Sequence, residues 1–261
     1  AYIAIRLQST VPVSLFMDAV ALDPFSQFFK VLILLSTVIV MLISFISGEL
    51  KEYRLGEYFS IMTIMTLGLF LMSSSIDMLM VYLSIEIVSI MSFFLAGYLK
   101  RNSSSNEASL KYVIYGSFAS GIMLFGLSLL YGVSGSLDIG LVASKVSNFE
   151  SSAAIYIAIL FILVGFGYKI SMVPFHYWTP DVYQGAPITV TAFLSVAPKA
   201  AGFAILIRFF YTLFIDNIEI LQWPQLIAVL AALTMTVGNV LALNQSNIKR
   251  LLAYSSISHV G

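Results

Sequence analysis

The chain has 261 residues, of which 59% are hydrophobic and only 10% are charged. Because ordinary soluble domains carry about 25% charged residues, this composition excludes that class and predicts a polytopic membrane protein. The 13 basic and 13 acidic residues cancel, which gives no support for nucleic-acid binding. The sequence contains no cysteine, so thiolate-held iron–sulfur clusters and disulfides are excluded and any redox cofactor must lie on a partner.

Hydropathy predicts seven membrane-spanning helices, each near the roughly 20 residues that cross a hydrocarbon core. The predicted fold class is all-α, with residues 1–261 in a single transmembrane domain. The chain starts at Ala1 without an initiator methionine and stops inside a new apolar segment, so we expect a fragment. The predicted spans are about 24–47, 57–75, 77–99, 107–132, 153–173, 187–213 and 223–243, with the start of a truncated span at 250–261.

The segment before the first span is the least regular. Residues 9–23 include Pro12 and Asp18 among apolar residues, and we expect an extended or hairpin-like loop there. Asp23 followed by Pro24 is typical of a helix start, with aspartate as the N-cap and proline at the first helical position.

Glu86 is an ionisable residue inside the 77–99 span. It lies nine residues into this helix, about 13 Å deep at 1.5 Å per residue. Tyr82, Ser89 and Phe93 share its face, which makes that face the polar one. Glu86 is therefore a candidate proton-pathway carboxylate, and the alternative is a protonated glutamate that a neighbouring helix satisfies.

The 107–132 span is predicted to serve mainly in packing. The sequence from Ser104 to Glu107 has the spacing of a capping box. The pairs Gly116/Ser120 and Ser117/Gly121 have the small-xxx-small spacing that lets helices approach closely. Lys111 lies within about two turns of one end, so simple snorkelling to the membrane surface is an alternative to a functional role.

Lys169 follows sixteen uncharged residues of the 153–173 span, about 24 Å from the helix start. Five positions later, Pro174 removes a backbone donor and is expected to kink or end the helix. Broken helices inside a membrane are tolerated where the backbone lines an enclosed or watery cavity. Lys169 is thus a candidate proton-transfer residue, with a snorkelling lysine as the alternative. The loop that follows contains His176 in an aromatic cluster, which is typical of an interface belt.

Lys199 lies twelve residues into the 187–213 span, about 18 Å from its end, which is too central for easy snorkelling. The preceding Pro198 frees a backbone carbonyl one turn back. A desolvated ammonium gives up its proton more readily, as a reversible proton carrier must. Arg208 lies near the other end of the same span, where snorkelling is expected. His259, about 13 Å into the last segment, is either a proton relay or a hydrogen-bonding residue.

The distribution of basic residues predicts the orientation. If the spans alternate, only Arg6 and Lys145 fall on one side. Short loops rich in Lys and Arg stay on the cytoplasmic or matrix side, so residues 1–23 and 133–152 are predicted to face outside. The basic residues on the predicted inner side are Lys51, Arg54, Lys100, Arg101, Lys249 and Arg250.

Several long motifs of the sequence resemble those of a known family. The chain from about residue 18 onward resembles subunit N of the proton-translocating NADH–quinone oxidoreductases (respiratory complex I), an antiporter-like membrane subunit. The motifs stand in the family's order, and they are long and specific. They are the apolar helix around Glu86, Glu107-Ala-Ser-Leu-Lys111-Tyr, Gly116-Ser-Phe-Ala-Ser-Gly121, Lys169-Ile-Ser-Met-Val-Pro-Phe-His-Tyr-Trp-Thr-Pro-Asp-Val-Tyr-Gln-Gly-Ala-Pro187, Ala197-Pro-Lys199-Ala-Ala and Asn247-Ile-Lys-Arg-Leu-Leu-Ala-Tyr-Ser-Ser-Ile-Ser-His259.

The resemblance implies two inverted five-helix repeats with proline-broken helices, of which this chain would contain the first and the start of the second. It implies that Glu86 and Lys169 form a coupled acid–lysine pair. Lys111 would be a modulating lysine, Lys199 the central proton-bearing lysine, and His259 a member of the polar axis.

The resemblance also implies what lies outside the chain. No cofactor is expected in this chain; NADH, FMN, iron–sulfur clusters and quinone would be bound by partner subunits, so the chain would be a translocase subunit without redox chemistry of its own. Its partners would be the other membrane subunits of complex I and the lipid bilayer, with no nucleic acid. The expected location is a bacterial inner membrane, with an organellar inner membrane as the alternative.

Two other functions stay open. A subunit of a multisubunit cation/proton antiporter would use the same glutamate and lysines without NADH, and the neighbouring genes would discriminate the two. A purely structural spacer is the third possibility. A shared fold alone does not decide among them.

Overall fold

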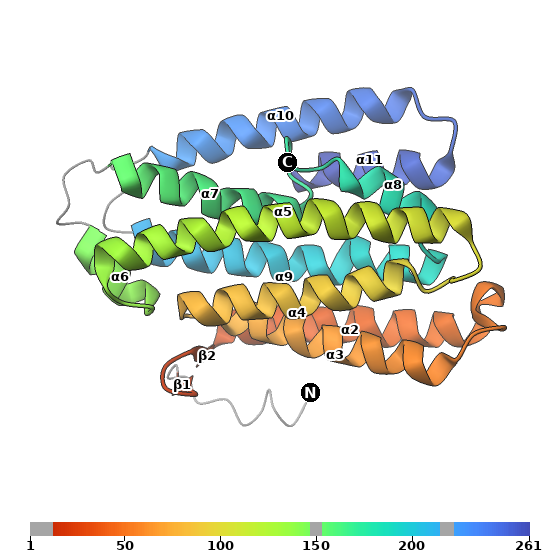
Figure 1. Ribbon diagram of the computed structural model, residues 1–261, viewed down its shortest axis with the longest axis horizontal. Helices are drawn as coiled ribbons and strands as arrows, with labels where there is room; N and C mark the ends of the chain where they lie inside the picture. The colour runs from red at the N-terminus through yellow and green to blue at the C-terminus, as the bar shows by residue number, and fades with distance from the viewer. Residues whose placement is uncertain (1–12, 147–152, 215–221) are drawn as a thin grey trace.

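We describe residues 13–146, 153–214 and 222–261 of a computed structural model (Figure 1). The chain begins with a hairpin of two antiparallel strands, in which Ser14 pairs with Ala21, as expected for this segment. The elements in order are β1 (Val13–Leu15), β2 (Val20–Leu22), α2 (Pro24–Ile46), the 3-10 turn η1 (Gly48–Leu50), α3 (Leu55–Ser74), α4 (Met78–Ala96), α5 (Ser103–Ser134), α6 (Ile139–Val146), α7 (Ala153–Ile170), α8 (Trp178–Gly185), α9 (Ile188–Phe214), α10 (Trp223–Leu243) and α11 (Ile248–Val260).

Within the described residues, seven helices are long and apolar enough to cross a membrane: α2, α3, α4, α5, α7, α9 and α10. Each overlaps one of the predicted spans, and α5 extends beyond its predicted span at both ends. Apart from the short hairpin, the regular structure is helical, and this confirms the predicted class of an all-α polytopic membrane protein.

The two ends of the bundle differ in composition. The strands β1 and β2 and helix α6 lie at one end, the hairpin end (Figure 1). Bridges between Val20 and Ser75 and between Asp77 and Asp138 tie the loops together there. The opposite end, the basic end, holds the loops 47–54, 97–102 and 244–247 (Figure 1). Lys51, Arg54, Lys100 and Arg101 all belong to this end, whereas Arg6 lies outside the described residues.

Two helix starts show how well capping patterns predict structure. Asp23 caps α2 as expected, since its carboxylate accepts a hydrogen bond from the Ser26 amide at 2.7 Å. The predicted capping box from Ser104 to Glu107 is wrong. The N-cap of α5 lies two residues earlier, at Asn102, which is as good a cap as serine, and its side chain accepts a hydrogen bond from the Ser104 amide at 2.9 Å.

The predicted break near Lys169 divides one crossing into two helices. Helix α7 ends at Ile170, where Ser171 takes a left-handed conformation with φ of 68°. Pro174 has no amide hydrogen and restricts Val173 before it, so the helix cannot resume at once. Helix α8 then lies farther along the bundle towards the basic end (Figure 1). The segment 174–186, which we expected to be a loop, thus contains a short buried helix.

Helices α5 and α7 pack closely at Gly116, as predicted, where an added side chain would meet Tyr168 of α7 at 2.9 Å, and at two glycines that were not predicted. A side chain at Gly126 would meet the Ala158 carbonyl of α7 at 2.6 Å, and one at Gly165 would meet Met123 of α5. Gly121 faces open space, so its predicted packing role is wrong. Small residues spaced four apart allow two helices to pack closely only where they lie on the face that contacts the neighbouring helix.

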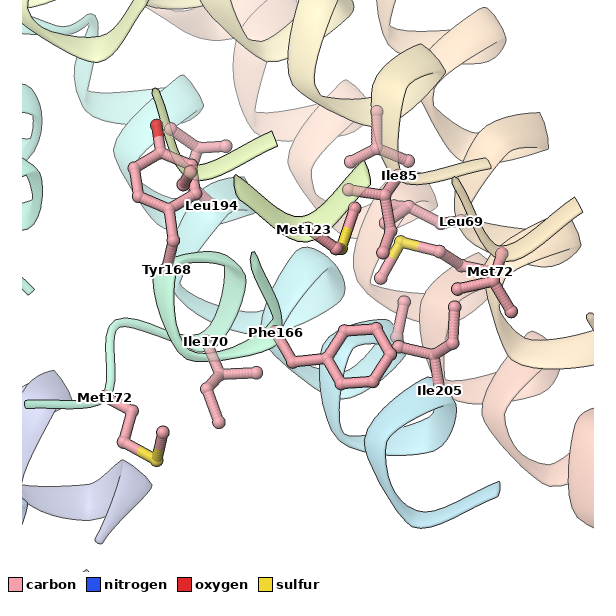
Figure 2. Close-up of a cluster of buried hydrophobic side chains, with 14 of the residues drawn as sticks. Leu69, Met72, Ile85, Met123, Phe166, Tyr168, Ile170, Met172, Leu194 and Ile205 are labelled. Atoms are coloured by element: carbon pink, nitrogen blue, oxygen red, sulfur yellow. The ribbon is translucent and has the colours of Figure 1, made fainter. Parts of the chain in front are cut away.

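The apolar core surrounds the end of α7. Figure 2 shows Phe166 and Ile170 of α7 among buried side chains from α3, α4, α5 and α9, with Met172 on the extended chain after the helix. Phe166 and Ile205 are at most 1% exposed. The break is therefore fixed inside the packed protein, where an irregular backbone can exist at membrane depth.

Candidate functional site: buried lysines around a broken helix

Lys169 is buried in the last turn of α7, next to the helix break. Its side chain is 3% exposed, and its amine donates a hydrogen bond to the Ser89 hydroxyl of α4 at 3.1 Å. Ser89 lies near the middle of α4, so the break brings Lys169 level with the centre of that helix.

Glu86 lies one turn from Ser89 on the same helix. Its Oε1 atom is buried and has no hydrogen-bond partner in the described part of the chain. No direct ion pair joins Glu86 to Lys169, whose amine instead contacts Ser89 on the same helix as Glu86. The structure thus places the two predicted partners one helical turn apart at α4, with the lysine bonded to a neutral hydroxyl and one oxygen of the half-buried glutamate left without a partner.

Aromatic side chains hold the break in place. The Trp178 indole donates to the Tyr168 carbonyl at 3.0 Å, so the first residue of α8 binds the last turn of α7. Trp178 also stacks on Tyr112 of α5 with ring centroids 4.4 Å apart. His176 is 4% exposed and stacks on Tyr177. The predicted interface location of His176 is therefore wrong: the helix break turns this residue into the protein.

Lys199 occupies the middle of α9 and is 6% exposed. Its amine donates to the Ser256 hydroxyl of α11 at 2.6 Å and to the Ser256 carbonyl at 3.3 Å. The ring of Tyr183 from α8 lies 5.7 Å away. Like Lys169, this central lysine has uncharged hydrogen-bond partners.

Lys111 lies near the basic end and has charged partners. Its amine contacts Glu107 and Asp181, each at 2.8 Å. Arg250 binds the second oxygen of Asp181 at 2.5 Å. These ions join α5, α8 and α11 beside a cavity of about 210 Å³. Lys111 is thus anchored by two carboxylates and does not simply snorkel.

Arg208 also differs from its expected role as a snorkelling residue. It forms a two-point ion pair with Asp23 at 2.8 and 2.9 Å, and the two side chains are 10% and 16% exposed. Partial burial alone raises the pKa of Asp23, but the hydrogen bonds from Arg208 and from the Ser26 amide, together with the charge of Arg208, outweigh it and hold this pKa below its ordinary value. The pair fastens the start of α2 to α9 at the hairpin end.

The remaining candidate, His259, is exposed on α11, and the structure does not bring it to either lysine. The sequence did not reveal the hydrogen-bond partners of the three lysines. These partners are Ser89 for Lys169, Ser256 for Lys199 and Asp181 for Lys111. Ser89 lay on the polar face of Glu86, which was a usable signal. The described residues contain no cluster of three or more His, Asp or Glu that could hold a metal ion.

Two buried lysines and a buried glutamate oxygen without a partner among the described residues thus lie within a bundle of apolar helices, around a broken helix. Residues 75–261 match the family model described as NADH:quinone oxidoreductase/Mrp antiporter, TM. The chain belongs to this family.

Two further comparisons agree with that assignment. The chain is 49% identical to NADH-quinone oxidoreductase subunit N 2 of Chloroherpeton thalassium, over 98% of this chain and 52% of the relative. Relatives from other bacteria at about 44% identity also bear the name subunit N. The chain therefore spans about half the length of the curated relatives that it matches.

Solved structures show the same fold. A chain of respiratory complex I from Thermus thermophilus with bound Aureothin matches with a TM-score of 0.81 and 34% identity, over 99% of this chain and 54% of that chain. A chain of the membrane-bound sulfane sulfur reductase, an archaeal respiratory membrane complex, matches with a TM-score of 0.83 and 25% identity, over 95% and 50%. The same architecture thus occurs in complexes with different redox chemistry.

Proposed function

We propose that this chain is part of a proton-translocating membrane subunit of an NADH:quinone oxidoreductase in a bacterial inner membrane. The observation that carries the proposal is the pair of buried lysines, each hydrogen-bonded to a serine. Intramembrane lysines are costly and usually serve transport. A lysine without a carboxylate in contact can lose its proton without leaving a buried anion behind.

The proposed proton path runs from the Glu86–Lys169 pair to Lys199. A carboxylate close to an ammonium stabilises the charged form, and its withdrawal favours release of the proton. At 4 Å and an effective dielectric of about 20, a unit ion pair amounts to about 4 kcal/mol. A movement of Glu86 relative to Lys169 would therefore be enough to drive a proton towards Lys199.

Lys111 is proposed to modulate this step by its charge, and His259 to continue the polar axis. Partner subunits would bind NADH, FMN, iron–sulfur clusters and quinone and would supply the redox energy, since a chain without cysteine cannot ligate an iron–sulfur cluster through thiolates. The other membrane subunits of the complex would be its lateral neighbours.

Substitution of Lys199 by alanine in the full-length protein tests the proposal. NADH-driven proton uptake into membrane vesicles should fall roughly a hundredfold, as for loss of a proton-transfer group, while the complex still assembles. Lys145→Ala is the matched control, because Lys145 also bonds a neutral oxygen, the Ser134 carbonyl, but at the hairpin end. Uptake at the wild-type rate in Lys199→Ala would contradict the proposal.

A cation/proton antiporter is the second candidate, because the family description covers both functions. The two candidate functions differ in what drives proton movement. An antiporter subunit would exchange protons for Na⁺ or K⁺ in vesicles without NADH, whereas the proposed function predicts proton uptake that requires NADH and does not depend on a gradient of Na⁺ or K⁺.

A further inference from the structure

Ser89 has a position that the proposed proton path leaves unexplained. In the part of the chain that the structure describes, its hydroxyl is the one hydrogen-bond acceptor of the Lys169 amine. The serine is 2% exposed. Its own hydroxyl hydrogen is used in a bond to the Ile85 carbonyl at 2.8 Å, so the free lone pairs of the oxygen remain for the lysine.

A second acceptor lies one helical turn away. Ser89 and Glu86 are three residues apart on α4, which is about 4.5 Å along the helix axis and on one face. The Oε1 atom of Glu86 is buried and unpaired among the described residues. The lysine has a flexible four-carbon stem, so a change of rotamer can move its amine from one acceptor to the other.

We infer that Ser89 is a positioning residue that holds Lys169 in a state separated from Glu86, so that the lysine alternates between a serine-bound open state and a carboxylate-bound closed state. The inference rests on the proposed function, and it assigns to Ser89 the control of whether Lys169 contacts Glu86. The structure described here is the open state.

The Ser89 hydroxyl and the Glu86 carboxylate differ in whether they favour the protonated form of Lys169. A neutral hydroxyl accepts a hydrogen bond from both an ammonium and an amine, so the open state lets the lysine release its proton. A carboxylate favours the ammonium. Without the serine hydroxyl the open state loses its hydrogen bond, and the balance should move about tenfold towards the closed state, as for the loss of one hydrogen bond to a charged group.

Three variants of the full-length protein in its native membranes test this role. Ser89→Ala should lower the proton-uptake rate about tenfold, and Ser89→Thr, which keeps the hydroxyl, should restore most of it. Ser84→Ala is the matched control: Ser84 is also fully buried on α4, but its hydroxyl bonds only the Val81 carbonyl among the described residues. Uptake is normalised to the amount of assembled protein.

A second readout follows the carboxyl group directly. The infrared bands of Glu86 are identified by their loss in Glu86→Gln. They should shift in Ser89→Ala, because the lysine then moves onto the carboxyl group, and should stay in place in Ser89→Thr and Ser84→Ala. Unshifted bands in Ser89→Ala overturn the inference, even with reduced uptake, because the serine would then serve only packing. Wild-type uptake in Ser89→Ala also overturns it.

Failure of this inference is distinguishable from failure of the proposed function. If Lys169→Ala and Glu86→Gln both pump normally, the proposed function is wrong. If those two variants fail to pump and Ser89→Ala behaves like the wild type, the proton path stands and the role of Ser89 is wrong.

Discussion

Two buried lysines at the middle of the helix bundle and two cations near its ends, Lys111 and Arg208, have different kinds of partner. At the centre, Lys169 and Lys199 bond to serine hydroxyls. At the ends, Lys111 and Arg208 contact carboxylates at 2.8 Å. A cation against a carboxylate keeps its charge and ties helices together, whereas a desolvated cation beside a neutral group is free to release a proton. The type of partner, hydroxyl or carboxylate, thus indicates whether a cation in the bundle serves transport or structure.

The largest expected effect comes from arginine substitutions, because arginine keeps the charge but cannot release its proton. Lys199→Arg and Lys169→Arg should each reduce proton uptake roughly a hundredfold. Lys111→Arg should retain most of the rate, since an arginine can still pair with Glu107 and Asp181. Vesicle uptake assays compare the three, and equal losses at all three positions would remove the distinction between centre and ends.

The next effect concerns coupling within the centre. Glu86→Gln and Lys169→Ala should each lower uptake severalfold or more, and the double variant should be little worse than the poorer single one. Residues that act as a unit show such non-additivity. Independent, multiplying losses in the cycle would show that the two residues do not work as a pair.

Breaking the ion pair at the hairpin end should affect stability and leave transport per molecule unchanged. Asp23→Asn should cost about 2 kcal/mol, because it leaves the Arg208 charge without its partner. Because the pKa of Asp23 is held below its ordinary value, the pair should stabilise the protein fully above about pH 4 and be lost as the pH falls further. Thermal unfolding in detergent, followed for both proteins over a range of pH, measures the loss of stability in Asp23→Asn and its pH dependence.

The smallest effect is expected at the basic end. Asp181 is 29% exposed in its pairs with Lys111 and Arg250, so Asp181→Asn should cost only about 1 kcal/mol. Proton uptake should fall less than in the central variants. A loss as large as that of Lys199→Arg would mean that this network belongs to the proton path.

Much of the fold could be predicted because membrane spans depend on one property, an apolar stretch of sufficient length. The break near Pro174 was also predictable, since a missing amide hydrogen has the same effect in any fold. Helix α8 was missed because it is short and polar for a membrane segment. Its stability comes from burial against α5 and α11, which no local pattern reveals.

The site was predicted in its charged members but not in their partners. Glu86, Lys169 and Lys199 stand out because charge is rare in lipid. Ser256 does not stand out, because serines are common, and even Ser89, which shares the polar face of Glu86, could not be matched to Lys169, since each serine contacts its lysine from a helix that is distant in sequence. Asp23 illustrates the same limit: the sequence indicated its capping role, but Arg208 lies 185 residues away.

The account is tested most directly by measuring proton uptake and thermal stability on the same preparations of Lys199→Ala and Arg208→Ala, two truncated cations on one helix. We expect Lys199→Ala to keep its unfolding temperature and lose roughly a hundredfold in uptake. Arg208→Ala should unfold at a lower temperature but keep its uptake per assembled molecule. The reverse pattern, or the same pattern in both variants, would contradict the separation of central proton carriers from structural cations at the ends.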